Sequence, residues 1–438
     1  MRVSALLALP AAVVLATIAL VPAPRAAETS DTLSWQWHLR AARAALASGD
    51  DALARAHLIA TDSLSGGHTG ARSALATLAA RAGDREGVLR WLDAFARTGL
   101  TRDVGRDTLF APWRQDSAFR AIAARLAANA APVGDLSPAV ALGDASLLAE
   151  DVAWDAPRGR FLVSSIHRRR ILAVDRAGSV TGFTEPGAGM TWGVYGLALD
   201  AANGLLWATT AAGPECDAYS PSDSGRTALF ACDLRTGRLR RRVELPRAAA
   251  RQVLGDLAVG PDGTVYASES LGGALYRLRR GGGTLETLVP AGEFVSPQGC
   301  VLSADGARLY VADYARGIAA VSLAGGGVTW LPRPYSLSSG GVDGLYRDGD
   351  RLIAIQNGPN PKRVLELSLD SAGTRITAWR VLAQGGERLG EPNHGTRVGR
   401  EFYLIGDSGW DRVGEDGRLR TGADSRPPVL LRLSLDHR

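Results

Sequence analysis

Residues 340–358 read GGVDGLYRDGDRLIAIQNG, in which an Asp-Gly pair opens a short apolar run, a tight turn follows, and a second apolar run ends in an amide. Apolar runs on both sides of a turn rich in Asp and Gly indicate two antiparallel strands. Taken alone, the stretch predicts no more than a hairpin. The fold is decided by how often it recurs.

The same pattern occurs six times along the chain. In register, the copies are EDVAWDAPRGRFLVSS from Glu150, YGLALDAANGLLWATT from Tyr195, GDLAVGPDGTVYASES from Gly255, QGCVLSADGARLYVAD from Gln298, DGLYRDGDRLIAIQN from Asp343 and HGTRVGREFYLIGDS from His394. The intervals between them are 45, 60, 43, 45 and 51 residues. Each copy predicts two strands and a turn, and most are followed by a third apolar segment such as ALFACDL.

Repeats of this length, with about four strands each, are typical of propeller blades, because one such sheet cannot bury its own faces. The six copies therefore predict an all-β six-bladed β-propeller over residues 134–438. We expect PPVLLRLSL (427–435) to supply an outer strand of the last blade and SPAVALGDAS (137–146) to complete the same sheet. A β-sandwich is the alternative fold, but it does not predict repetition at this interval.

Residues 28–133 have a different period. Ala and apolar residues recur at helical spacing, and ASGDDALARAHL is echoed by RAGDREGVLRWL, with 34 residues between Gly49 and Gly83. Helix pairs at this period resemble a degenerate tetratricopeptide array. A peptide-binding groove and a small helical cap are the two interpretations, and two repeats favour the cap.

The first 27 residues predict an export signal, with Arg2 followed by an uncharged run from Val3 to Val21 and small residues before Glu28. An uncleaved membrane anchor is the alternative, because the run approaches the roughly 18 residues that span a bilayer. Either way we expect an exported protein, periplasmic or secreted.

Composition excludes several classes of protein. With 46% hydrophobic and 22% charged residues, the chain has the composition of a soluble globular protein. The net charge of +5 comes from arginines spread along the chain, which does not predict nucleic-acid binding. The three cysteines match neither a disulfide scaffold nor a zinc site; Cys216 and Cys232 can bridge one hairpin, or all three can remain unpaired.

The first residues of the six copies are expected to meet at one mouth of the propeller channel, because the innermost strand of each blade lines it. These residues are Glu150, Tyr195, Gly255, Gln298, Asp343 and His394. Two carboxylates, an amide and an imidazole brought together favour a bound cation, since unneutralised acids are costly to bury. Oxygen-rich ligation points to calcium, whereas His394 suits a softer metal or acts as a base beside the ion.

These motifs resemble the senescence marker protein/gluconolactonase (regucalcin-like) family and, more distantly, the paraoxonases. EDVAWDAPRGRFLVSS resembles the family's Glu-bearing strand, SPQGCVLSADGARLYVAD its Pro-Asn-Gly strand and VDGLYRDGDRLIAI its Asp-Gly strand. In that family a Glu, an Asn and an Asp hold one divalent metal, and the enzymes hydrolyse lactones or related esters.

The resemblance implies Glu150 and Asp343 as metal ligands, with Gln298 in place of the family's Asn. The third blade departs from the pattern, because Gly255 stands where the family often has Asn. Asp256 and His394 are the candidate catalytic bases. His167, Tyr195, Asn357, Asn393 and Asp407 are candidate residues of the substrate pocket; turn capping or surface exposure is the alternative role for His167, Asn357 and Asp407.

Two functions follow as hypotheses. The first is an exported, calcium-dependent hydrolase of lactones or related esters that takes a small-molecule substrate. The second is a non-catalytic propeller that binds a peptide, glycan or protein partner, with the helical region as a second docking surface.

Overall fold

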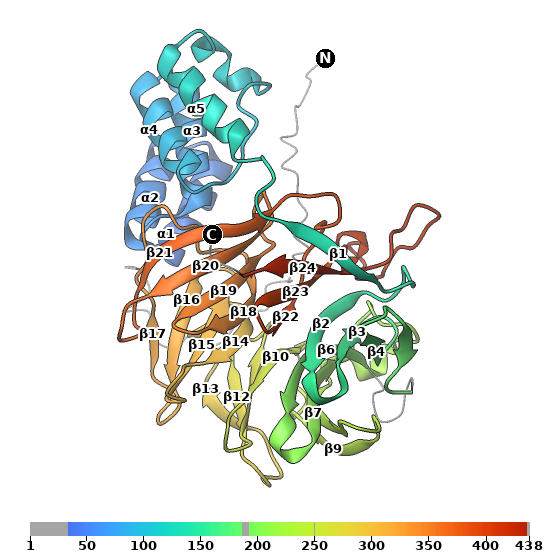
Figure 1. Ribbon diagram of the computed structural model, residues 1–438. Coiled ribbons are helices and arrows are strands. Elements are labelled where there is room, and N and C mark those ends of the chain that lie inside the picture. The colour runs from blue at the N-terminus through green and yellow to red at the C-terminus, as the bar shows by residue number, and fades with distance from the viewer. Residues whose placement is uncertain (1–33, 186–191, 249, 436–438) are drawn as a thin grey trace. The chain divides into compact units, whose positions relative to one another are not determined.

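The computed structural model describes residues 34–185, 192–248 and 250–435 (Figure 1). The predicted export signal or anchor lies outside the described residues. Contacts divide the described chain into two compact units: the first comprises 136–300 and 387–435, and the second comprises 34–135 and 301–386. No helix in the described ranges has the length and apolar character that a bilayer span requires.

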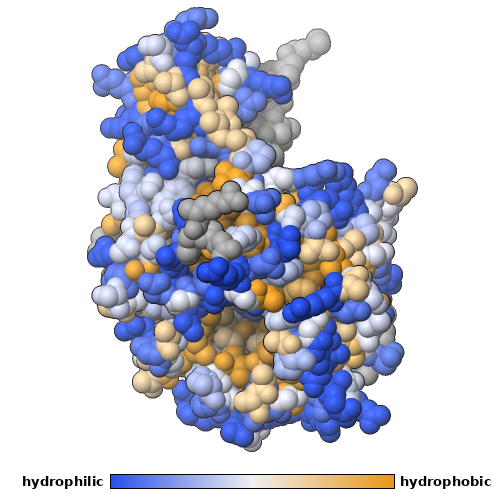
Figure 2. Space-filling model, in the orientation of Figure 1, coloured by the Kyte–Doolittle hydropathy of each residue, from blue (hydrophilic) through white to orange (hydrophobic). Residues whose placement is uncertain are grey.

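The helical region of the second unit contains five α-helices. They are α1 (Trp35–Ser48), α2 (Asp51–Leu64), α3 (Thr69–Arg81), α4 (Arg85–Ala96) and α5 (Ser117–Ala128), with a 3₁₀ helix at Thr108–Trp113. Gly49 ends α1 in the left-handed region at φ 79°, and Gly83 lies between α3 and α4 at φ 69°. The two glycines that define the 34-residue period therefore separate two helix pairs. Figure 2 shows hydrophilic side chains over most of this region's visible face, with apolar ones among them.

Within the second unit, the helical region is joined to the propeller strands by buried arginines. Arg72 of α3 pairs with Asp62 at 2.8 Å and donates to the carbonyl oxygen of Tyr335 at 3.0 Å. Arg363 donates to the carbonyl oxygen of Thr98 at 3.0 Å. Because these guanidinium groups are buried, each acceptor that they reach offsets part of the cost of removing them from water. The helices are thus a docked part of this unit.

The strands form six antiparallel sheets of four, so the fold is the predicted six-bladed β-propeller. The first sheet is formed by β2 (Ala149–Asp155), β3 (Arg160–Ser165), β4 (Arg170–Asp175) and β5 (Val180–Gly182), and the second by β6 (Gly193–Asp200), β7 (Leu205–Ala211), β8 (Thr227–Asp233) and β9 (Leu239–Glu244). The third is formed by β10 (Leu254–Val259), β11 (Val265–Glu269), β12 (Leu275–Leu278) and β13 (Glu286–Val289), and the fourth by β14 (Pro297–Leu302), β15 (Arg308–Asp313), β16 (Gly317–Ser322) and β17 (Val328–Trp330). The fifth is formed by β18 (Val342–Asp348), β19 (Arg351–Gln356), β20 (Arg363–Leu369) and β21 (Ile376–Gln384).

The sixth sheet joins the start of the propeller to its end. Its order is β1 (Leu136–Ala141), β24 (Val429–Ser434), β23 (Glu401–Gly406) and β22 (Gly395–Val398). Leu136 faces Leu433 across the antiparallel pair of β1 and β24. The prediction that the first strand and the C-terminal tail complete one blade is confirmed.

The first strands of the blades in the first unit share an irregularity that positions the candidate site. Their ladders shift register between Ala149 and Val152, between Val194 and Leu197, and between Leu254 and Leu257. A hydroxyl group on the second strand fills each bulge: Ser164 Oγ accepts the N–H of Asp151 at 2.9 Å, and Thr209 Oγ1 accepts that of Gly196 at 2.8 Å.

The same hydroxyls link neighbouring blades. Ser164 donates to the carbonyl oxygen of Tyr195 at 2.6 Å, and Thr209 donates to that of Gly255 at 2.8 Å. At Gly196 a Cβ atom would lie 2.8 Å from the Gly255 carbonyl oxygen, so the strands approach too closely for a side chain. The starts of the first two repeats are therefore each fixed to the next blade by a side-chain hydroxyl group that bonds to the backbone of both.

Candidate functional site

The second residue of the repeat, rather than the first, provides two buried acids that lie close together in the first unit. This position is Asp in the first and third copies, at Asp151 of β2 and Asp256 of β10, and Gly in the other four. With His394, which precedes β22, the two aspartates form a buried cluster whose ligand atoms all lie within 4.8 Å of one another. We call these three residues the Asp-Asp-His cluster.

Both carboxylates are held by backbone N–H groups. Asp151 accepts from its neighbour Val152 and from Leu197 of the next blade, each at 2.7 Å. Asp256 repeats the arrangement, accepting from Leu257 at 2.7 Å and from Cys300 at 2.9 Å. Each carboxylate therefore links two blades and is held in a fixed orientation.

The electrostatics of the cluster favour a positive charge. The pKa of Asp151 is raised to about 7; burial is the largest cause, the nearby His394 opposes it, and Asp256 acts in the same direction as burial. Two neighbouring carboxylates in a buried site cannot both be ionised unless a cation lies between them. Without a cation, one of the two binds a proton. Burial, with the nearby Asp256 and Asp151, also raises the pKa of the Cys300 thiol well above its usual value, so this residue is a neutral thiol at pH 7.

The donor set fits a divalent cation. Two ligands bound to one calcium ion at about 2.4 Å can be no more than about 4.8 Å apart, and the ligand atoms of the cluster lie within this limit. The carboxylates suit a hard cation, and the imidazole suits a softer one or serves as a base. Asp256 and His394, the predicted catalytic bases, are thus together, and Asp151 is the member that the sequence analysis missed.

The missed residue had a signal in the sequence. Glu150 and Asp151 are adjacent acids, and the family resemblance drew attention to Glu150. The distinguishing feature was that Asp151 and Asp256 occupy the position where the other copies have glycine. An acid where the backbone otherwise needs the smallest residue indicates a specific role.

Glu150, a predicted metal ligand, accepts hydrogen bonds from two side chains through one carboxylate oxygen. Its Oε2 accepts from Asn393 Nδ2 at 2.7 Å and from the indole nitrogen of Trp410 at 2.6 Å. Its carbonyl oxygen also accepts from the N–H of His394 at 3.3 Å. Asn393, predicted as a pocket residue, therefore orients this carboxylate, and metal ligation by Glu150 stays a prediction.

Gln298, the second predicted ligand, contacts the third blade. Its Oε1 accepts from Ser270 Oγ at 3.3 Å, and its Nε2 donates to Ser296 Oγ at 2.8 Å. The same two side chains lie over the α-carbon of Gly255, where a Cβ would be 3.8 Å from Gln298 Oε1. In the third blade, where Gly255 replaces the Asn that the family often has, the side chains of Ser270 and Gln298 therefore occupy the space that a larger residue would need.

Asp343, the third predicted ligand, belongs to the second unit. Its Oδ2 accepts from Asn357 Nδ2 at 2.7 Å, and Asn357 Oδ1 accepts from the hydroxyl of Tyr314 at 3.0 Å. Burial, and to a lesser extent Asp343, raises the pKa of Tyr314. Asn357 was predicted as a pocket residue, and the structure places it against Asp343.

Tyr195 and His167 share a second network in the first unit. The hydroxyl of Tyr195 donates to buried Glu215, which also pairs with Arg251. The ring of His167 bonds through Nδ1 to the carbonyl oxygen of Glu215 at 2.8 Å. Burial, followed by the nearby Glu215, raises the pKa of Tyr195. Because Glu215 follows β7, both predicted pocket residues contact the loop after this strand.

Asp407 has a structural partner. Its Oδ2 accepts from Arg388 Nε at 2.7 Å, and its backbone is in the left-handed region at φ 48°. The three cysteines are free and buried. Of the two alternatives that the sequence left open, the structure therefore has three unpaired cysteines and no Cys216–Cys232 bridge.

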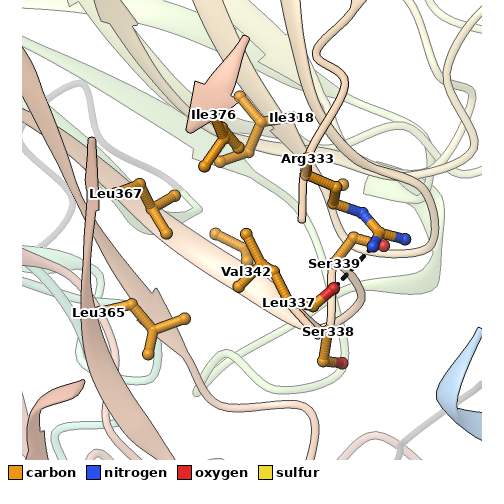
Figure 3. Close-up of a pocket in the computed structure, with 10 residues that line it drawn as sticks. Ile318, Arg333, Leu337, Ser338, Ser339, Val342, Leu365, Leu367 and Ile376 are labelled. Carbon is orange, nitrogen blue, oxygen red and sulfur yellow. Dashed lines mark hydrogen bonds between the residues drawn. The ribbon is translucent and has the colours of Figure 1, made fainter. Parts of the chain in front are cut away.

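A small cavity lies in the second unit (Figure 3). Aliphatic side chains dominate its lining, and Arg333 at its edge donates to the carbonyl oxygen of Leu337 at 2.7 Å. The full lining is Gly317, Ile318, Arg333, Leu337, Ser338, Ser339, Val342, Leu365, Leu367 and Ile376. The cavity contains none of the predicted site residues, so we do not assign it as the site.

No protein family and no curated protein matches the chain. Its fold is similar to that of solved six-bladed propellers. A gluconolactonase from Xanthomonas campestris is 18% identical over 71% of this chain and 93% of its own, with a TM-score of 0.43. A calcium-binding protein, regucalcin, from Agrobacterium tumefaciens is 16% identical over 68% of this chain and 93% of its own, with a TM-score of 0.46.

A protein with a different activity is equally similar. The PQQ-bound aldose sugar dehydrogenase from Streptomyces coelicolor is 17% identical over 69% of this chain and 100% of its own, with a TM-score of 0.47. Similarity at this level does not separate lactone hydrolysis from other chemistry. Function therefore has to be argued from the site residues.

Proposed function

We propose that this protein is an exported propeller that binds a divalent cation in the Asp-Asp-His cluster and hydrolyses lactones or related esters. The observation that carries the proposal is the burial of two carboxylates and an imidazole within 4.8 Å of one another. Buried acids at this distance are costly unless a proton or a cation compensates them. The resemblance of the repeats to the gluconolactonase family supports the choice of reaction, and the N-terminal segment supports export.

We assign Asp151 and Asp256 as the carboxylate ligands and His394 as the general base beside them. A bound divalent cation polarises a carbonyl oxygen and lowers the pKa of water. Backbone N–H groups fix both carboxylates, so they present the same oxygens whether or not substrate is bound. In its neutral form, the His394 imidazole can accept the proton of the attacking water.

The identity of the cation is part of the proposal. Calcium follows from the carboxylate ligands, and a softer metal such as zinc would require His394 as a ligand. In the first case His394→Gln keeps the metal and loses activity. In the second it loses both, so the same variant distinguishes the two arrangements.

The decisive experiment is metal analysis of the purified protein followed by a panel of lactones and esters. We expect about one equivalent of a divalent metal and turnover that a chelator abolishes. Asp350→Asn is the matched control, because this carboxylate is 94% exposed and belongs to a turn. Metal-free protein that cannot be loaded, with no turnover, would overturn the proposal.

A second candidate function is supported by the surface of the helical region. Leu53 and Leu64 of α2 are 48% and 54% exposed, and Leu46 and Ile59 are also exposed. Exposed aliphatic side chains on a tetratricopeptide-like region are consistent with a non-catalytic module that binds a peptide, glycan or protein partner. Intact metal binding without turnover of any substrate, together with loss of partner capture in Leu53→Ser, would favour this function.

A further inference from the structure

Two histidines face each other across the first helix pair. His38 of α1 and His57 of α2 bring their Nδ1 atoms to 2.9 Å, a distance at which they share one proton. Both residues are partly exposed, so ions in solution can reach them. Neither residue takes part in the site described above, which lies in the other unit.

The surrounding structure holds the rings in place. Trp37 meets both edge-on, with centroid distances of 5.0 Å to His38 and 5.3 Å to His57. The turn at Gly49 sets α1 against α2, and Ser34 and Asp50 cap the two helices. The two Nδ1 atoms are thus held beside each other by two rigid elements, and a rotation of the rings would turn both toward one ion, as a chelating site requires.

We propose that His38 and His57 form a copper(II) site that bridges α1 and α2. Metal–imidazole bonds are about 2.0–2.1 Å long, so nitrogens 2.9 Å apart subtend an angle of roughly 90° at the metal. This angle matches the tetragonal geometry of copper(II). Tetrahedral zinc would require the nitrogens to separate to about 3.3 Å.

The donor chemistry leads to the same choice. Two imidazoles without a carboxylate disfavour calcium and magnesium, which take oxygen ligands. Among divalent first-row metals, copper(II) has the highest intrinsic affinity for nitrogen donors. On binding, the proton of the donating Nδ1 would move through water to Nε2 of the same ring, so both imidazoles stay neutral, both Nδ1 lone pairs become available to the metal, and water completes the coordination. The oxidation state of the metal does not change.

The site is distinct from the Asp-Asp-His cluster in ligands and in preferred ion. A protein with both would hold a hard cation in the propeller and copper on the helical region. Variants in one site should leave the other unaffected, since they are in separate units. The two proposals can therefore fail independently.

The test uses the full-length, metal-free protein titrated with copper(II) and observed by electron paramagnetic resonance and tryptophan fluorescence. We expect one tight equivalent with a dissociation constant below about 10 µM, hyperfine splitting from two nitrogens, and quenching of fluorescence. His38→Asn and His57→Asn should each weaken binding at least tenfold and remove the two-nitrogen signal. His167→Asn is the control, because this histidine belongs to the Glu215 network.

Circular dichroism shows whether the variants keep their helices, and zinc competition tests the choice of ion. If His57→Asn unfolds, His38→Asn carries the test. Copper binding that is unchanged in both variants would overturn the proposal. Weaker binding than 10 µM, or displacement of copper by equimolar zinc, would also overturn it.

Discussion

The carboxylate of Asp151 accepts a hydrogen bond from the backbone N–H of Leu197, which joins the first blade to the second at 2.7 Å. Asp256 and Cys300 repeat the relationship at 2.9 Å. The cluster is therefore built from groups that also hold the blades together. Metal binding and the stability of the first unit should be coupled, because the same carboxylates serve both.

Replacing Asp151 by Ala should destabilise the metal-free protein. The N–H groups of Val152 and Leu197 would lose their acceptor in a buried site, which costs about 1–3 kcal/mol for each group left unsatisfied. Relief of repulsion with Asp256 offsets part of this loss, so we expect a net decrease of about 2 kcal/mol in the free energy of unfolding. Urea denaturation measures it. Asp350→Ala should change stability by less than about 0.5 kcal/mol, and equal effects of the two variants would refute the argument.

Calcium should stabilise the wild-type protein and not the Asp256→Asn variant. At about 100 times the dissociation constant, a ligand bound only to the folded state adds about 2.7 kcal/mol to the free energy of unfolding. This corresponds to a rise of several degrees in the melting temperature. Differential scanning calorimetry with calcium and with a chelator measures the difference. A melting temperature insensitive to calcium, zinc and manganese alike would argue that a proton, rather than a cation, compensates the cluster.

Arg72 and Asp62 should depend on each other for stability. The pair is almost completely buried, with side-chain exposures of 1% and 3%, and the guanidinium lies 3.8 Å from the ring centroid of Tyr335. Arg72→Leu leaves the Asp62 carboxylate buried without its partner and should cost about 3–5 kcal/mol. Adding Asp62→Leu should recover a large part of this loss. A double-mutant cycle tests it, and purely additive effects of the two substitutions would contradict the prediction.

Most of the fold could be predicted from the repeats in the sequence. Period-2 apolar runs, turn residues and the 40-to-60-residue interval predicted the six sheets, and the 34-residue interval between Gly49 and Gly83 predicted the helix pairs. Pairing of β1 with β24 was also predicted, because a propeller needs strands from both ends of its sequence. These features depend on local pattern, which a sequence displays directly.

The site was predicted less well, for a physical reason. A β-bulge at the start of β2 changes which side chains face one another, and a shift of one residue reverses the face of a strand. The sequence analysis predicted Glu150 as the metal ligand of the first blade, whereas its neighbour Asp151 belongs to the Asp-Asp-His cluster. The bulge depends on the Ser164 hydroxyl and on the carbonyl of Tyr195, 31 residues further on, and no local pattern reveals such a contact.

The stability of the helical region should fall as the pH falls below the usual pKa of histidine. His68 caps α3 by accepting the N–H of Ala71 through Nδ1 at 3.0 Å, which requires a neutral ring. Burial lowers its pKa to about 4, with Arg43 and Arg333 acting in the same direction and Asp62 opposing them. Between pH 6.5 and 4 the unfolded chain therefore binds a proton that the folded protein does not.

Stability from this group is complete above pH 6.5 and is lost as the pH falls toward 4, by up to about 3 kcal/mol. His68→Asn keeps a capping side chain but does not titrate. Urea denaturation followed by circular dichroism at pH 7 and pH 4.5 should show a smaller loss of stability in this variant than in the wild type. Because all other titrating groups are common to both proteins, identical losses would mean that His68 does not contribute to the pH dependence.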